Sequence, residues 1–203
     1  MREIFPTLLH EFEDPTFKQK QREFIKCVYE EKKKDPVGVN MTNRGGGWQS
    51  RNWRFRSENQ GPQGPSLLSE FLIEQIVNYF QKNRILKEGV EVRFANWWIN
   101  INTKGSFNVK HIHGSSHISG VFYLQASQGS GKIVFDSPHI FSRSRENASY
   151  STAIVDSLNY YPAMEFDPVE GMMMMFPSDL LHGVEENKSN KDRISLSFNI
   201  LVL

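Results

Sequence analysis

Three of the six histidines of this 203-residue chain fall within seven residues, in the stretch NVKHIHGSSHISG at 108–120. His111 and His113 are two residues apart, a spacing that turns both rings to the same side of a β-strand. Imidazole is the commonest metal ligand in proteins, so this pair can chelate one ion. A third ligand would come from another strand, and His182 is the only histidine after residue 139. The three histidines therefore predict a metal site held between strands.

Two other residues are alternatives at this site. His117 lies four residues after His113 in a serine-rich turn, where a polar surface role is the simpler interpretation. Asp136 follows the run GKIVF and could add a carboxylate ligand, but an aspartate before Ser-Pro also forms turns. A His-x-His pair arises by chance in strands as well, so spacing alone leaves the metal site open.

A second polar pair lies on the last predicted strand, DRISLSFNI. Arg193 and Ser195 alternate with apolar residues and therefore share one face of that strand. A buried arginine requires an anion, and its planar guanidinium fits a carboxylate with two parallel hydrogen bonds. An internal acidic residue is one such partner. Because Arg193 lies eleven residues after His182, a hairpin could also place it beside the metal, where a small dicarboxylate would bridge the two.

The elements that would carry these residues fall into two parts. Up to residue 89 the chain predicts two helices, one from Asp14-Pro15 to about Lys33 and one over 66–83 capped by Ser66, joined by a glycine-rich loop over 43–65. From residue 90 the apolar period changes from 3.6 towards 2. About eight short strands follow: VEVRFANWWINI, FNVKHIH, ISGVFYLQ, GKIVFDS, YSTAIVDS, YYPAMEF, GMMMMFP and RISLSFNILVL.

Strands without helical spacers pair mostly antiparallel, so the fold class is mainly β with flanking helices: a sandwich, barrel or jelly roll. We expect residues 1–203 to form a single domain, with 1–89 as a helical and loop part and 90–203 as the β core. The four methionines at 172–175 should fill the core beneath the helices. Trp97 and Trp98 must point to opposite faces of their strand, so at least one packs in the core.

The composition gives no net electrostatic reason to expect certain classes of partner, although a local charged patch stays possible. With 24 basic and 23 acidic residues the formal net charge is +1, which indicates neither nucleic acid nor a membrane surface as a partner. Cys27 is the only cysteine, so an intramolecular disulfide cannot form, which suits a reducing compartment. No apolar run approaches the length of a membrane span, and we expect a cytoplasmic protein. Helices flanking a jelly roll offer a surface for a homodimer.

The combination of H-x-H, a distant His and R-x-S about ten residues later resembles the 2-oxoglutarate- and Fe(II)-dependent oxygenases. The segments NRGGGWQS, WWINI, GSFNVKHIHGSSHISGVFYLQ, GKIVFDSPH and DRISLSFNI are similar to a poorly characterised branch of that superfamily found in marine bacteria and phages. The resemblance covers about residues 43–200 and implies a double-stranded β-helix, or jelly-roll, core. It implies an enzyme that uses Fe(II), 2-oxoglutarate and O2 to hydroxylate an unidentified substrate, releasing succinate and CO2.

Residue by residue, the resemblance implies His111 and His182 as iron ligands. It implies Arg193 and Ser195 as the groups that hold the distal carboxylate of 2-oxoglutarate. The superfamily usually has an aspartate two residues after the first histidine, completing a two-His-one-carboxylate triad. Here that position is His113, as in the narrower branch, so the implied ligand set is three neutral imidazoles.

Tyr123 and Asn100 lie on predicted strands that could line the pocket and donate hydrogen bonds to the cosubstrate. Two other functions remain open. A three-histidine zinc hydrolase would explain the histidines but gives Arg193 and Ser195 no role. A non-catalytic jelly-roll module, for binding or structure, would make the histidines incidental.

Overall fold

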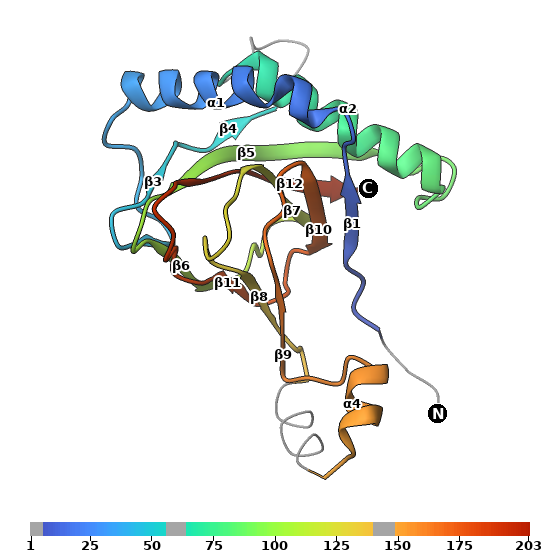
Figure 1. Ribbon diagram of the computed structural model, residues 1–203. Coiled ribbons are helices and arrows are strands. Elements are labelled where there is room, and N and C mark those ends of the chain that lie inside the picture. The colour runs from blue at the N-terminus through green and yellow to red at the C-terminus, as the bar shows by residue number, and fades with distance from the viewer. Residues whose placement is uncertain (1–5, 56–63, 140–148) are drawn as a thin grey trace.

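The computed structural model describes residues 6–55, 64–139 and 149–203, so part of the predicted loop over 43–65 lies outside the described residues. Two antiparallel β-sheets face each other (Figure 1). Two long helices cover the outer face of the larger sheet, and the smaller sheet lies on the side away from them (Figure 1). The space between the sheets is where inward-facing side chains from both can meet.

The larger sheet has the strand order β1-β10-β7-β12-β5-β3, with β4 also paired to β5. Its strands are β1 (His10–Glu13), β3 (Trp48–Gln49), β4 (Trp53–Arg54), β5 (Val92–Asn102), β7 (Ile118–Gln125), β10 (Met172–Pro177) and β12 (Arg193–Val202). The smaller sheet, in the order β2-β6-β11-β8-β9, contains β2 (Asn43–Arg44), β6 (Phe107–His111), β8 (Ile133–Asp136), β9 (Ala163–Phe166) and β11 (His182–Val184). From β5 onward the chain passes repeatedly between the two sheets, so the predicted mainly β jelly roll with flanking helices is confirmed.

The two predicted helices are present as α1 (Phe17–Lys34) and α2 (Ser66–Asn83). The predicted bounds of α2, 66–83, are confirmed, but α1 begins at Phe17 rather than at Asp14-Pro15, and neither Asp14 nor Ser66 is the residue that caps its helix. Asp14 accepts hydrogen bonds from the backbone N–H and hydroxyl of Thr16, at 2.8 and 2.7 Å, and so stabilises a turn before α1. Ser66 is the first helical residue of α2, because Pro65 occupies the cap position. None of the described helices is long and apolar enough to cross a membrane.

The larger sheet is buried on both faces, which explains its long apolar runs. Met173 and Met175 pack towards the helices, whereas Met174 packs between the sheets. The prediction that the methionines lie beneath the helices is therefore right only for alternate residues, because strand side chains alternate in direction. Trp97 and Trp98 divide in the same way: Trp97 is in the helix-side core, and the Trp98 ring lies 5.6 Å from that of His113.

Several further elements differ from the sequence prediction. YSTAIVDS contains a short helix, α4 (Thr152–Ser157), although its β-branched content favours a strand. Strands β1 and β11 were not predicted, and the predicted loop over 43–65 contains three two-residue strands, β2, β3 and β4, which pair with β6 or β5. β11 has only three residues and a shifted register against β6, so it has too little periodicity to be recognised.

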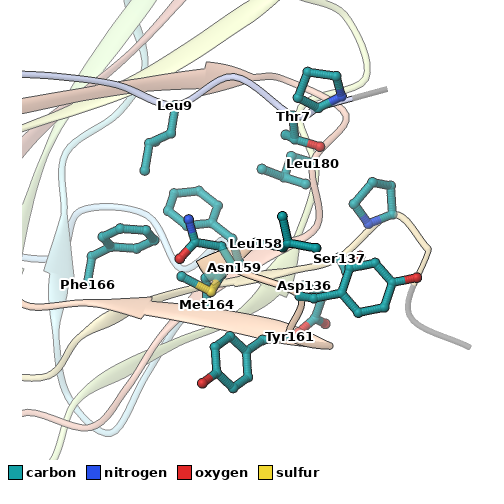
Figure 2. A pocket seen from close by; sticks show the side chains of 14 residues that line it. Thr7, Leu9, Asp136, Ser137, Leu158, Asn159, Tyr161, Met164, Phe166 and Leu180 are labelled. Carbon is teal, nitrogen blue, oxygen red and sulfur yellow. The ribbon is translucent and has the colours of Figure 1, made fainter. Parts of the chain in front are cut away.

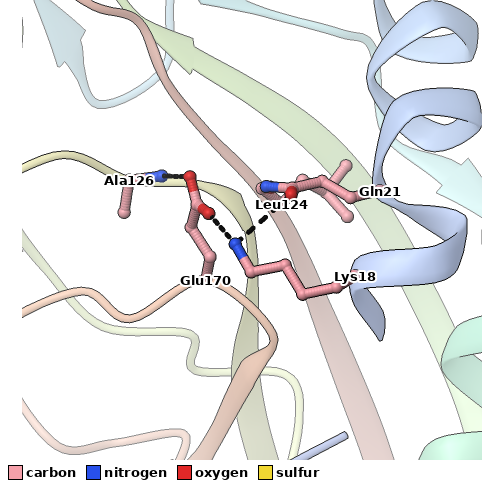
Figure 3. A network of polar contacts seen from close by, with 5 residues as sticks. All are labelled: Lys18, Gln21, Leu124, Ala126 and Glu170. Atoms are coloured by element: carbon pink, nitrogen blue, oxygen red, sulfur yellow. Dashed lines mark hydrogen bonds and ion pairs between the residues drawn. The ribbon is translucent and has the colours of Figure 1, made fainter. Parts of the chain in front are cut away.

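Polar contacts attach α1 to the β core (Figure 3). The Glu170 carboxylate accepts a hydrogen bond from the backbone N–H of Ala126, 3.2 Å away, and is ion-paired with Lys18. Lys18 also donates to Gln21, whose amide donates in turn to the Leu124 carbonyl at 2.8 Å. These contacts fix the first turns of α1 against the end of β7.

We expect Gly120→Ala to lower the free energy of unfolding by about 1–3 kcal/mol, the usual cost of overpacking a core. A Cβ at Gly120 would lie 2.2 Å from Phe198 Cζ and 2.8 Å from the Met174 carbonyl oxygen. The midpoint of urea unfolding measures the loss. Gly114→Ala is the matched control, since a Cβ there meets no atom within 4 Å. Equal midpoints for the two variants would contradict the packing of β7 against β12.

Candidate metal centre

Three histidine side chains converge between the two sheets. His182 begins β11 and pairs directly with His111 at the end of β6, so the strand ladder places these two rings together. The ring centroids are 4.4 Å apart for His111 and His182, 4.9 Å for His111 and His113, and 5.2 Å for His113 and His182. One nitrogen from each ring lies within 4.8 Å of the other two. The cluster expected from the sequence is therefore formed.

His111 and His113 do not lie on one strand, contrary to the prediction from their spacing. β6 ends at His111, so His113 lies two residues beyond the strand, in the connection to β7. Its ring reaches the cluster because of the path of this connection, not because of the two-residue period of a strand. The backbone N–H of His113 donates to the Ser178 carbonyl at 2.7 Å.

Hydrogen bonds orient the other two rings. Nδ1 of His111 lies 2.9 Å from the Val109 carbonyl oxygen, and Nδ1 of His182 lies 2.8 Å from that of Leu180. A carbonyl only accepts, so both Nδ1 atoms carry the proton. The lone pair of each ring is then on Nε2, which is the arrangement that outer hydrogen bonds impose on metal-binding histidines.

The environment keeps the three imidazoles neutral. Burial lowers the pKa of His182 to about 4, opposed by its bond to Leu180 and assisted by the nearby His111. Burial, with His182 and His111 adding to it, lowers the pKa of His113 to about 3. The pKa of His111 is also lowered by burial. Three neutral nitrogen donors at this spacing fit a divalent transition metal.

We expect the metal-free protein to lose stability as the pH falls below about 6.5, the pKa of an unfolded histidine. Folded His113 and His182 resist protonation until about pH 3 and 4. In between, the unfolded state binds more protons, so the free energy of unfolding falls as the pH falls. His113→Gln should make this dependence shallower, which urea unfolding at a series of pH values would measure. Identical slopes in the variant and the parent protein would contradict the burial of this ring.

All seven residues predicted from the sequence line one cavity of about 50 Å³ between the sheets. On the larger sheet, strand register assembles four of them. Ser195 on β12 lies directly opposite Tyr123 on β7 and Asn100 on β5, and Arg193 lies opposite Asn102. The face of β12 predicted for Arg193 and Ser195 is confirmed, since the intervening Ile194 packs in the helix-side core.

Arg193 is a buried cation that is paired with no carboxylate of the described residues. Only 3% of its surface is exposed. Its Nη1 donates to the carbonyls of Gly131 at 2.9 Å and Ser130 at 3.4 Å, and its buried Nε has no hydrogen-bond partner. Within the described residues it forms no ion pair with a carboxylate. Burial lowers its pKa to about 10, so it remains charged at neutral pH, and the cavity fits an anion.

The neighbours of Arg193 offer further hydrogen bonds. Burial raises the pKa of Tyr123 to about 12, so its hydroxyl stays protonated and can donate. Asn100 donates from Nδ2 to the Ser197 hydroxyl at 3.0 Å, while its buried Oδ1 meets no hydrogen-bond donor in the described part of the chain. The sequence analysis missed Asn102, which lines the same cavity and also has an unpaired Oδ1. Asn102 could have been predicted, because it lies two residues after Asn100 on the same strand and therefore shares its face.

The two alternative ligands lie outside the cluster. Both carboxylate oxygens of Asp136 accept hydrogen bonds from Lys110 Nζ, each at 2.7 Å. Lys110 reaches Asp136 across Gly183, where a Cβ would come within 3.1 Å of Lys110 Cγ. The carboxylate is thus held by a lysine, not directed at the histidines. His117 is exposed, and its Nδ1 accepts from the backbone N–H of Val202 at 2.9 Å.

A larger cavity, of about 310 Å³, is lined by residues of the N-terminal segment, of β8 and of the segment that leads into β9 (Figure 2). Its walls are mainly apolar and include Leu9 from the N-terminal segment and Phe166 from β9. Phe135 and Leu180 also line it. The Phe135 ring is 5.9 Å from that of His182, and the Leu180 carbonyl is the partner of His182 Nδ1. This volume is within the range of small-molecule sites.

Residues 96–199, more than half of the chain, match the family model described as "Putative 2OG-Fe(II) oxygenase". The match contains every residue predicted for the site. The chain therefore belongs to this family of 2-oxoglutarate- and Fe(II)-dependent oxygenases. The protein is an enzyme of that class, and its cofactors are Fe(II), 2-oxoglutarate and O2. Family membership selects this function over the zinc hydrolase and the non-catalytic module.

Solved structures show the same fold. A prolyl-4-hydroxylase from Pseudomonas putida is 14% identical, with a TM-score of 0.61, over 95% of this chain and 92% of that chain. The viral collagen prolyl hydroxylase of Paramecium Bursaria Chlorella virus-1, in complex with 2-oxoglutarate, is 12% identical, with a TM-score of 0.56, over 95% and 94%.

HygX from Streptomyces hygroscopicus, with nickel and 2-oxoglutarate bound, is 14% identical, with a TM-score of 0.56, over 96% of this chain and 82% of that chain. At these identities the likeness establishes a shared double-stranded β-helix and nothing about the substrate. No curated protein sequence matches the chain.

Proposed function

We propose that the protein hydroxylates an unidentified substrate while 2-oxoglutarate is converted to succinate and CO2. In this proposal His111, His113 and His182 hold Fe(II). Arg193 and Ser195 hold the distal carboxylate of 2-oxoglutarate. The observation that carries the proposal is the buried Arg193, paired with no carboxylate of the described residues, in the same cavity as the three histidines.

The ligand set determines the charge at the metal. Bound Fe(II) supplies the oxygen chemistry needed to oxidise an unreactive C–H bond. Three neutral imidazoles offset none of its +2 charge, unlike the usual set with one carboxylate. The anionic cosubstrate is then the group that would offset it. Asp136 cannot take this role without giving up Lys110.

A carboxylate bound in this cavity would be held both by the charge of Arg193 and by hydrogen bonds from its neighbours. Arg193 supplies the charge and the free Nε–H, and the Ser195 hydroxyl and the protonated Tyr123 hydroxyl supply neutral donors. Asn100 adds an amide donor if its side chain turns by 180°. The Ser197 hydroxyl can then donate to Oδ1, which leaves Nδ2 free to face the cavity.

We also propose that residues 1–203 act as one domain, because α1 and α2 share one buried core with β5, β7, β10 and β12. The segments NRGGGWQS and GSFNVKHIHGSSHISGVFYLQ, with histidine at 113, support a place in the branch from marine bacteria and phages. The mainly apolar 310 Å³ cavity supports a substrate with an apolar group.

The proposal is tested by turnover without the primary substrate, since such enzymes can consume cosubstrate slowly on their own. Protein loaded anaerobically with Fe(II) and 2-oxoglutarate is exposed to O2, and succinate is measured. Succinate should form in the Fe(II) protein and not in the Zn(II) protein, because zinc has no redox chemistry. Equal amounts in both would exclude the oxygenase reaction at this site.

A further inference from the structure

The third histidine of the cluster lacks the support that the other two have. His111 and His182 lie on paired strands, and each ring is oriented by a backbone carbonyl. His113 lies beyond the end of β6, and no hydrogen bond to its ring is found within the described residues. Its position must therefore be set by the backbone of the connection between β6 and β7.

Ser178 holds both ends of that connection. Its carbonyl accepts a hydrogen bond from the backbone N–H of His113 at 2.7 Å. Its own N–H donates to the His117 carbonyl at 3.1 Å. Ser178 follows β10 and is 1% exposed, so this clamp is inside the protein and shielded from water. A shift of Ser178 would therefore move both ends of the connection, and the bond to the His113 N–H would displace His113 itself.

A buried chain of polar side chains fixes Ser178 in turn. Its hydroxyl lies 2.8 Å from that of Ser119 on β7. Ser119 donates to Oδ1 of Asn199 on β12 at 2.7 Å, so Ser178 is the donor to Ser119. Asn199 then donates from Nδ2 to Oδ1 of Asn96 on β5, also at 2.7 Å. The chain crosses three strands of the larger sheet, β5, β12 and β7, and ends at Ser178, whose backbone is hydrogen-bonded to the connection that carries His113.

We propose that Ser178, held by Ser119 and Asn199, is a positioning residue that keeps His113 within the metal site. The inference rests on the proposed role of His113 as a ligand. Strands of the larger sheet thereby fix the position of His113, which stands where the superfamily usually has a carboxylate. Strands of the smaller sheet fix the positions of His111 and His182. The physical basis is the cost of breaking a hydrogen-bond chain whose members Ser178, Ser119 and Asn199 are buried, because the break leaves unpaired polar groups in the interior.

The test is Co(II) titration of the metal-free protein, followed by visible absorption, which responds to the number and geometry of the ligands. Ser178→Ala and Ser119→Ala should each weaken Co(II) binding by about 10- to 100-fold, the usual effect of losing an outer-shell partner. Ser50→Ala is the matched control. Ser50 is 2% exposed and hydrogen-bonded to the backbone of Ile99 and Arg51, outside the polar chain. It should lower stability without changing the Co(II) spectrum.

A double-mutant cycle separates positioning from general destabilisation. In a His113→Ala background, Ser178→Ala should have no further effect on Co(II) affinity, because its effect is exerted through His113. Additive losses would overturn the inference, as would an unchanged affinity in both serine variants. If His113→Ala alone left the Co(II) affinity and spectrum unchanged, His113 would not be a metal ligand, and the proposed ligand set would be wrong. This result differs both from additive losses and from unchanged affinity in the serine variants.

Discussion

Replacing His182 by alanine should abolish stoichiometric Fe(II) binding. His182 is 4% exposed, pairs with His111 in the strand ladder and presents Nε2 to the cluster. Losing it leaves two of three protein ligands. Since outer-shell changes already cost 10- to 100-fold in metal affinity, we expect a loss of more than about 100-fold. Iron content after anaerobic dialysis and a calorimetric titration would measure it.

Two controls show whether this loss is specific to the ligand. His139→Ala removes an exposed histidine that is outside the cluster and should retain iron. His182→Phe keeps a ring in contact with Phe176, whose centroid is 4.7 Å from that of His182, and so limits the cavity left by the substitution. It should lose iron while remaining folded by circular dichroism. A folded His182→Phe protein with one tightly bound iron would remove this residue from the metal site.

Replacing Arg193 by methionine should leave iron binding intact and weaken 2-oxoglutarate binding by about 30-fold or more. Removing one partner of a buried, hydrogen-bonded charge pair costs about 2–5 kcal/mol, and 1.4 kcal/mol corresponds to a factor of ten. Methionine fills much of the arginine volume but has no donor. Titration of the Fe(II) protein with 2-oxoglutarate gives the affinity.

The contributions of the charge and of the planar shape of Arg193 to 2-oxoglutarate affinity can be measured separately. Arg193→Lys retains a cation but cannot form two parallel hydrogen bonds, so its affinity should lie between those of the parent protein and the methionine variant. Arg93→Met, on the exposed part of β5, removes an arginine from the surface and should have no effect. Unchanged 2-oxoglutarate affinity in Arg193→Met would show that the carboxylate is held elsewhere.

The residue types of the site could be predicted from the sequence because each depends on a local pattern. Alternation along RISLSFNI was enough to place Arg193 and Ser195 on one face, and the structure has them there. Their partners could not be predicted. That Ser195 meets both Tyr123 and Asn100 depends on strand order and register, which are set by contacts between residues far apart in the chain.

The errors arise where non-local contacts override local preference. His113 joins the cluster from a connection, under the control of Ser178, which is 65 residues away in the sequence. Asp136 was weighed as a ligand because no local pattern shows that Lys110 crosses Gly183 to reach it. The segment YSTAIVDS has strand propensity but forms α4, since propensity is a weak determinant outside a sheet.

We propose that one cavity binds Fe(II) through three histidines and 2-oxoglutarate through Arg193. The most direct measurement is an anaerobic titration of the metal-free protein with Fe(II) and then 2-oxoglutarate, followed by visible absorption. A charge-transfer band between the metal and the keto acid should appear only when both are present, and Arg193→Met should require far more 2-oxoglutarate to produce it. Iron binding without this band at saturating 2-oxoglutarate would contradict the account.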